Sequence, residues 1–360
     1  MIVLISSDYR VRYADDIVRL LALPKEGQML FRYDEALLSD EVKSRLPRMQ
    51  LAQKKLLVCF LTNNADITPA TFVPVRFARI IRAERIGQSV LFTLAAEEFV
   101  EGVTDADIRS AASPADRARL STLAVPGKIF GFQVNENWKT HRSSTLKAFE
   151  ETAKTLSANK AFASPSKAFY TVSRLARLQG ESWYVKTEPD LHVHMGVYKL
   201  HAGISYECEV YCLNYHGASA APLVGPVAPP PVLAADTNSA WVEFGSVKRH
   251  AIDTKYDVKR FIFSTEPHTF RRSSGISLFL TGKIDAASSD YRQDILLQVN
   301  FGGSFWLGLA RAAAIGSATA APGMIAINAA GKLTPLAAGA ALIAGLFAGL
   351  LSVYPLLKPK

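Results

Sequence analysis

ISYECEVYCLNY, residues 204–215, indicates the fold most directly. It is a short run rich in aromatic and β-branched side chains, which is typical of a β-strand. Further runs of this kind recur at roughly regular spacing and make residues 165–302 a predominantly β region: KAFYTVSRLARL, SWYVKTE, LHVHMGVYKL, AWVEFGSVKRH, VKRFIFST, ISLFLTG and DILLQVNF. Many short strands without long helices between them predict a sandwich-like or barrel-like domain, interrupted by a Pro/Ala-rich loop at 217–240.

Residues 1–105 predict a smaller unit of mixed α and β structure. MIVLI and LLVCFL are short apolar runs suited to buried strands, and DEALLSDEVKSRL has the spacing of an amphipathic helix. Residues 106–164 follow, where the stretch around DADIRSAASPADRARLST is polar, KIFGFQVNENW has strand character, and SSTLKAFEETAKTLSANK has a serine N-cap and one apolar face. We expect a helical connector there, and an α+β protein overall.

Composition narrows the functional classes. Apolar residues make up 49% of the 360 residues and charged ones 20%, so the chain can bury a core. Three cysteines are too few for a disulfide framework, and MIVLISSDYRVRY does not resemble a secretory signal. The net charge of +9 favours an anionic partner only weakly. We expect the bulk of the chain in the bacterial cytoplasm.

The C-terminal stretch LAAGAALIAGLFAGLLSVYPLLKPK (336–360) is strongly apolar. No charged side chain lies in residues 333–357, a length that exceeds the about 20 residues needed to cross a bilayer. A second, weaker run upstream has no charge at 312–331 but is interrupted by Pro322 and Gly323. We therefore expect a transmembrane hairpin near 304–328 and 334–356, within 303–360. A single span is the alternative. The positive-inside rule then predicts a multi-pass inner-membrane protein.

Individual residues have expected roles in this hairpin. Small side chains spaced by four would let helices pack closely, within the hairpin or in a homo-oligomer. Aromatic and basic residues near the ends would lie at the membrane interface. The packing residues are Ala341, Gly345 and Gly349, and the interface residues are Phe305, Trp306, Arg311, Lys358 and Lys360.

One segment combines histidines and cysteines. On strands, His192 and His194 would face the same side, as would Cys208 and Cys212, and two such pairs on adjacent strands suit zinc. The spacing lacks the C-x2-C pattern of familiar zinc sites, and a cysteine on a strand is more often a small buried hydrophobe. We expect no metal and no cofactor.

A second segment, VKRHAIDTKYDVKRFIFSTEPHTFRRSS (247–274), combines basic and aromatic residues. Such a surface suits nucleic-acid phosphates and bases, or an anionic lipid surface. The alternative is the charged outer face of a sandwich. The candidate polyanion-binding residues are Lys248, Arg249, Lys259, Arg260, Arg271 and Arg272.

No catalytic signature is present. The sequence contains no G-x-S-x-G, G-x-x-x-x-G-K-[ST] or G-x-G-x-x-G motif, and its acidic pairs suit solvated faces. We therefore expect a protein that is not an enzyme.

Two resemblances add to this interpretation. PVRFARIIRAERIGQSVLFTL (74–94) resembles strand pairs of small PUA/EVE-type barrels, some of which bind modified bases or RNA. The layout of cytosolic domains followed by a two-helix hairpin is similar to membrane effectors of bacterial anti-phage abortive-infection systems, including retron-associated ones. The resemblance implies an effector that senses a cytosolic protein or nucleoprotein partner and perturbs the lipid bilayer. A membrane-tethered binding or scaffold module, with a protein or nucleic-acid ligand, is the alternative.

Overall fold

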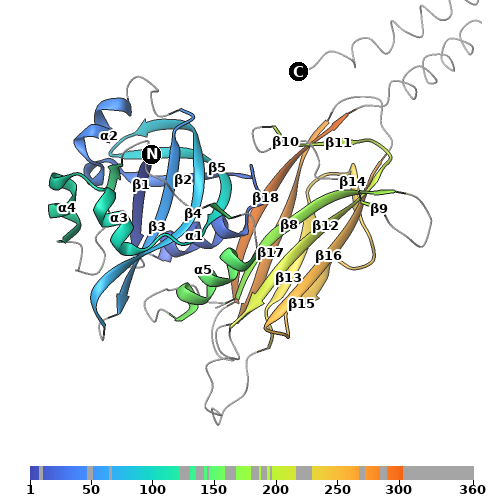
Figure 1. The fold of residues 1–360 in the computed structure, drawn as a ribbon. Coiled ribbons are helices and arrows are strands. Elements are labelled where there is room, and N and C mark those ends of the chain that lie inside the picture. The colour runs from blue at the N-terminus through green and yellow to red at the C-terminus, as the bar shows by residue number, and fades with distance from the viewer. Residues whose placement is uncertain are drawn as a thin grey trace, which may run out of the picture.

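The computed structural model contains two β-rich units with helix α5 (Leu146–Ala158) between them in the chain (Figure 1). It describes residues 1–7, 11–46, 52–64, 67–121, 130–134, 142–143, 146–158, 168–179, 186–187, 193–194, 197–215, 229–266, 272–283 and 290–302.

The N-terminal unit is a curled, barrel-like sheet with the strand order β2-β5-β4-β3-β1-β6, and β7 pairs with β5. Only β1 and β3 are parallel among these pairs. The two ends of the sheet meet where Leu38 bridges Gly131 and the Ser39 amide donates to the Gly131 carbonyl at 2.7 Å. The strands are β1 (Ile2–Ser7), β2 (Gln28–Asp34), β3 (Lys55–Asn64), β4 (Ile67–Ile86), β5 (Ser89–Val100), β6 (Phe130–Gln133) and β7 (Arg142–Ser143).

The first strand is apolar from Ile2 to Ile5, where both of its faces are buried. Ile2 and Leu4 belong to the main core, whereas Val3 and Ile5 belong to a second cluster under the helices α3 and α4. The sequence of a strand that is buried on both faces is a continuous apolar run rather than an alternation of apolar and polar residues. The helices of this unit are α1 (Val11–Ala22), α2 (Asp40–Arg45), α3 (Asp105–Ala111), α4 (Pro114–Ser121) and the 3-10 turn η1 (Glu35–Leu37).

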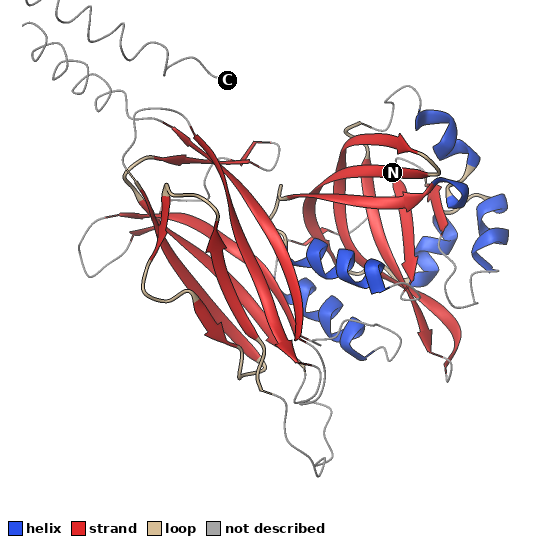
Figure 2. Ribbon diagram, turned by 180° about the vertical axis from the view of Figure 1, so that it is seen from behind, coloured by secondary structure: helices blue, strands red, loops and turns tan. Residues whose placement is uncertain are grey.

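The second unit is a sandwich of two sheets (Figures 1 and 2). One has the order β14-β16-β12-β8-β9 and the other β10-β11-β18-β17-β13-β15. In the central strand β12, Tyr206, Cys208, Val210 and Cys212 are buried, at alternate positions. The strands are β8 (Ala168–Gln179), β9 (Lys186–Thr187), β10 (Val193–His194), β11 (Val197–His201), β12 (Ser205–Asn214), β13 (Val232–Thr237), β14 (Val242–Phe244), β15 (Arg249–Ala251), β16 (Tyr256–Thr265), β17 (Arg272–Lys283) and β18 (Asp290–Gly302).

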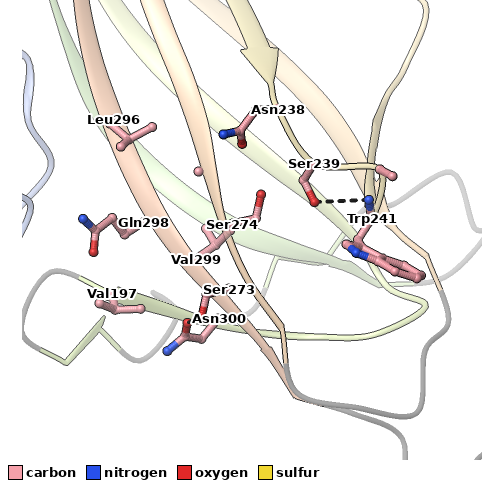
Figure 3. A pocket seen from close by; sticks show the side chains of 12 residues that line it. Val197, Asn238, Ser239, Trp241, Ser273, Ser274, Leu296, Gln298, Val299 and Asn300 are labelled. Atoms are coloured by element: carbon pink, nitrogen blue, oxygen red, sulfur yellow. Dashed lines mark hydrogen bonds between the residues drawn. The ribbon is translucent and has the colours of Figure 1, made fainter. Parts of the chain in front are cut away.

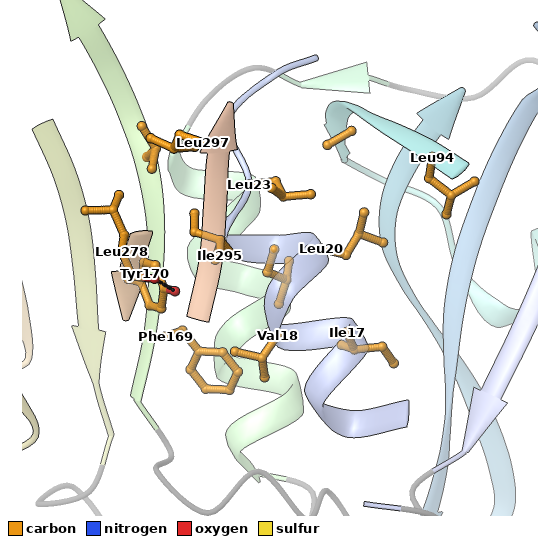
Figure 4. Close-up of a cluster of buried hydrophobic side chains, with 14 of the residues drawn as sticks. Ile17, Val18, Leu20, Leu23, Leu94, Phe169, Tyr170, Leu278, Ile295 and Leu297 are labelled. Atoms are coloured by element: carbon orange, nitrogen blue, oxygen red, sulfur yellow. Dashed lines mark hydrogen bonds between the residues drawn. The ribbon is translucent and has the colours of Figure 1, made fainter. Parts of the chain in front are cut away.

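Helix α1 joins the two units into one core. Val18 points toward Phe169 of the sandwich, and Leu20 points the other way, toward Leu94 of the N-terminal sheet (Figure 4). Among the described residues, β9 and β11 pair with only the ends of β8 and β18. Helix α1 therefore covers the remaining edges of both sheets, which would otherwise expose unpaired backbone.

Helix α5 makes a second link between the units. The ring of Phe149 lies 5.6 Å from that of Phe99 in the N-terminal sheet and 6.1 Å from that of Tyr211 in the sandwich. The Tyr211 hydroxyl donates to the Glu150 carboxylate. The N-terminal sheet also takes in β6 and β7, which lie within the predicted helical connector at 106–164.

The expected fold class and membrane topology need correction. The described chain is mostly β-sheet, in three sheets, rather than an α+β protein that ends in a transmembrane hairpin. No described helix is long and apolar enough to cross a membrane. The longest, α5, has 13 residues and spans about 20 Å, against about 30 Å for the hydrocarbon core. The expected multi-pass inner-membrane localisation is corrected on the same finding. The segments 304–328 and 334–356 lie outside the described residues.

Candidate binding groove

A groove with a volume of about 760 Å³ lies at one end of the sandwich (Figure 3). It is formed by the start of β17, the end of β18, one residue of β11 and the connection from β13 to β14. Its lining residues are Val197, Asn238, Ser239, Ala240, Trp241, Ser273, Ser274, Gly275, Leu296, Gln298, Val299 and Asn300.

The pairing of β17 with β18 positions two amide side chains. Gln298 pairs with Gly275 and Asn300 pairs with Ser273, and alternate residues of a strand share a face, so both amides project from the same side. The Ser273 hydroxyl donates to Oδ1 of Asn300 at 2.6 Å. This bond orients the amide and leaves the two N–H donors of Asn300 directed away from Ser273.

Gly275 and Leu296 form the apolar part of the floor. A Cβ atom at position 275 would lie 2.6 Å from Cδ1 of Leu296, so this leucine can lie across β17 only because the residue beneath it is glycine. The Leu296 side chain is 51% exposed. It offers an apolar surface beside the amides of Gln298 and Asn300.

Hydroxyl groups hold the connection between β13 and β14. The Thr237 hydroxyl donates a hydrogen bond to the Gly275 carbonyl at 3.0 Å and accepts one from the Ser239 amide at 3.2 Å. The Ser239 hydroxyl in turn accepts the Trp241 amide at 3.2 Å. Figure 3 shows Trp241 at the margin of the groove, across from Val197 and Gln298. The wall is thus fixed to the strand that it faces.

The polar part of the lining is uncharged. Three carboxamides (Asn238, Gln298, Asn300) and three hydroxyls face it, and none of the described lining residues carries a charge or titrates near neutral pH. Ser274 Oγ is buried and makes no hydrogen bond within the described part of the chain. Such a surface can exchange hydrogen bonds with a ligand, but it offers no general acid, base or nucleophile of perturbed pKa.

The candidate polyanion-binding residues are dispersed in the structure. Arg260 lies on the outer face of its sheet, with its guanidinium 3.4 Å from the Glu209 carboxylate and 3.8 Å from that of Glu207. Lys259 pairs with Asp257 at 2.6 Å and is largely buried. Lys248 and Arg249 are exposed at β15, in the other sheet. Arg271 lies outside the described residues, and Arg272 begins β17.

The two cysteines considered above as zinc ligands face the sandwich core. Cys208 and Cys212 are buried, and burial raises the pKa of each thiol to about 12. His194 is on β10, in the opposite sheet, and His192 lies outside the described residues. Among the residues that the structure describes, no group of three or more His, Cys, Asp or Glu side chains could hold a metal ion.

The expected membrane residues lie outside the described part of the chain: Phe305, Trp306, Arg311, Ala341, Gly345, Gly349, Lys358 and Lys360. Conversely, sequence reasoning missed the groove. Its residues come from separate segments near 197, 240, 274 and 298, and none carries a recognisable motif. The only local signal is the polar pair Gln298 and Asn300, which alternates with the buried Leu297, Val299 and Phe301.

Comparisons with known proteins add little. No protein-family model matches the chain, and no curated protein matches it significantly. Among solved structures, the chain is similar to a Bacteroides ovatus GH5 xyloglucanase in complex with a XXXG heptasaccharide, at 9% identity and a TM-score of 0.17. That match covers 29% of this chain and 17% of the xyloglucanase chain, and a likeness this low carries no argument about function.

Proposed function

We propose that this chain is a non-enzymatic binding module whose groove takes an uncharged, hydroxyl-rich ligand of the carbohydrate class. The observation that carries the proposal is the composition of the groove, in which carboxamides, hydroxyls and one indole meet and no charged side chain is among the described lining residues.

Hydrogen-bond chemistry favours this class of ligand. A sugar hydroxyl both donates and accepts, and a carboxamide supplies both functions from one planar group. The fixed amide of Asn300, beside Gln298, therefore suits adjacent hydroxyls. Leu296 and Trp241 supply apolar surface for the C–H faces of a ring. A phosphate or carboxylate would lack a cation in this lining, which disfavours a polyanion.

This proposal keeps the binding module, which the sequence analysis gave as the alternative to a membrane effector. A membrane-perturbing effector would depend on residues 303–360, which lie outside the described part of the chain.

Calorimetric titration of the purified chain with neutral oligosaccharides tests the proposal, with a polyanion of similar length as the comparison ligand. Asn300→Ala and Gln298→Ala should each weaken oligosaccharide binding about 3- to 10-fold, the equivalent of one or two lost hydrogen bonds. Gln88→Ala removes an exposed carboxamide from the N-terminal unit and should leave affinity unchanged.

Lys199→Ala separates the two ligand classes. Lys199 is exposed and pairs with Asn300 along β11 and β18, so it is the cation nearest to that amide in the strand register. A neutral ligand should lose little affinity in this variant. Strong binding of the polyanion that Lys199→Ala abolishes, or neutral-sugar binding that survives both amide variants, would contradict the proposal.

A further inference from the structure

We propose that a second copy of this chain pairs with the open edge of β16, as an antiparallel strand related by a two-fold axis at Val258. This interface lies outside the groove and does not depend on its ligand.

The edge is open over the first half of the strand. On the side away from β12, β14 pairs only with residues 263–265 of β16. Among the described residues, no strand pairs with Tyr256–Arg260 on that side. Figure 1 shows β16 on the side of the sandwich that faces away from the N-terminal unit.

The backbone direction along β16 follows from its hydrogen bonds. The Ile262 carbonyl accepts from the Gly245 amide, toward the β14 side, whereas the Lys255 and Thr265 carbonyls accept from Asn214 and Gly203, toward β12. Peptide groups alternate in direction along a strand, and β16 pairs with β12 without a register shift. The N–H and C=O groups of Val258 therefore point to the open edge.

The side chains around Val258 are self-complementary. In the sequence Tyr256-Asp257-Val258-Lys259-Arg260, antiparallel pairing about Val258 sets Val258 against Val258 of the second copy. It sets the ion pair that Asp257 and Lys259 form within one strand, at 2.6 Å, against the same pair of the second copy, so that each carboxylate lies opposite an ammonium group. It also sets Tyr256 against the second copy's Arg260. Opposite charges, apolar pairs and an Arg guanidinium beside a Tyr ring all favour cross-strand pairing.

Exposure agrees with such an interface. Tyr256, Val258 and Ile262 are 48%, 47% and 47% exposed, and all three project from the outer face of the same strand. An unpaired edge that carries apolar side chains is a template for another strand. Two side-chain contacts compete at this edge. His250 Nε2 lies 3.1 Å from the Arg260 carbonyl, and the Thr254 hydroxyl donates to the Tyr256 carbonyl at 2.9 Å. Both side chains would have to turn away for the outer pairs to form, whereas the Val258 pair needs neither to move.

The interface leaves the groove accessible. The Glu266 amide donates to the Trp241 carbonyl, so Trp241 of the groove wall lies beyond the far end of β16. Eight residues of strand separate Val258 from that position, which corresponds to about 26 Å.

Cross-linking at the two-fold axis is the first test. Cα atoms of a hydrogen-bonded antiparallel pair are about 5.5 Å apart, a separation that a disulfide spans. Under mild oxidation, the full chain with Val258→Cys should form a disulfide-linked dimer on a non-reducing gel. Ile86→Cys, at a position 54% exposed in the N-terminal unit, is the matched control and should stay monomeric. The native cysteines are buried and should not contribute.

Sedimentation equilibrium over a concentration series is the second test. The unmodified chain should show a monomer–dimer equilibrium, and Val258→Lys, which sets two ammonium groups opposite each other, should raise its dissociation constant at least tenfold. Ile86→Lys should leave it unchanged. Monomer at every concentration, equal dissociation constants for Val258→Lys and the unmodified chain, or no more cross-linking in Val258→Cys than in Ile86→Cys would each overturn the proposal. The cross-linking result stands by itself if Val258→Lys fails to fold.

Discussion

The guanidinium of Arg76 closes the C-terminal end of α1, where its Nη1 atom donates to the Leu20 carbonyl at 2.7 Å. The same atom lies 3.1 Å from the Leu21 carbonyl and 2.5 Å from that of Leu23, and Nε donates to the Glu97 carbonyl at 3.0 Å. A helix end leaves carbonyl groups without intrahelical partners, and a buried cation satisfies them. Arg76 thereby holds α1 against the N-terminal sheet.

Replacing Arg76 should destabilise the whole chain. Desolvation lowers the pKa of Arg76 to about 9, which still leaves it charged at pH 7. Arg76→Ala would leave several buried carbonyl groups without a hydrogen-bond donor. We expect it to lower the free energy of unfolding, measured by urea denaturation, by about 3 kcal/mol. Arg82→Ala removes a largely exposed arginine of the same strand and should cost less than about 1 kcal/mol. Equal effects of the two variants would contradict this role.

Two glycines with equally close contacts should respond differently to alanine. A Cβ at Gly131 would lie 2.6 Å from buried Leu4 and Leu38, so Gly131→Ala should cost about 1–3 kcal/mol of stability. A Cβ at Gly275 meets the exposed end of Leu296, which can move aside, so stability should change by less than about 0.5 kcal/mol. Gly275→Ala should instead weaken oligosaccharide binding, because the groove floor shifts. Chemical denaturation and calorimetry measure the two effects, and a reversed order would refute the explanation.

Asp15 should make stability depend on pH. Burial raises the pKa of Asp15 above the ordinary value of 3.8, and a hydrogen bond to Gln293 and the charge of Arg19 oppose this rise. Two further carboxylates lie nearby in the facing elements: Asp16 on α1 and Asp294 on β18. The folded state then holds the proton more tightly than the unfolded state, so stability falls as pH rises through the window between the two pKa values.

The Asn variant isolates this effect. Asp15→Asn should be more stable than the unmodified chain at pH 7, and the difference should vanish as pH falls below 3.8. Urea midpoints across this range give the measurement. A difference that is independent of pH would show that the carboxyl does not titrate as described.

The cysteine thiols should report global unfolding. Burial raises the pKa of Cys208 and Cys212 to about 12 and raises that of Cys59 further, so all three remain protonated and shielded at neutral pH. A thiol reagent such as Ellman's should label none in the native chain and all three in guanidinium. Rapid labelling of one thiol under native conditions would show that its part of the core is open.

Local patterns predicted individual strands well. ISYECEVYCLNY corresponds to β12 at Ser205–Asn214, and its cysteines lie in the core as small hydrophobes. The apolar run MIVLI corresponds to β1, which is buried on both faces. The basic cluster was harder to interpret, because Lys248, Lys259 and Arg260 are close in sequence but lie on different faces with different partners.

Local sequence showed where most strands form and which side chains are turned inward, because side-chain alternation and apolar runs are properties of neighbouring residues. It also placed α5 within the predicted helix that follows Ser143. It missed β13 (Val232–Thr237), which lies inside the predicted Pro/Ala-rich loop at 217–240 and pairs with both β15 and β17. Tertiary contacts were needed to show that α1 is buried between two units, that Arg76 caps it, and that Asn238, Ser273 and Gln298 line one groove. These arrangements depend on strand order and register between segments that are distant in the sequence. Local periodicity shows that one face of an element is buried, but it does not show which other element packs against that face.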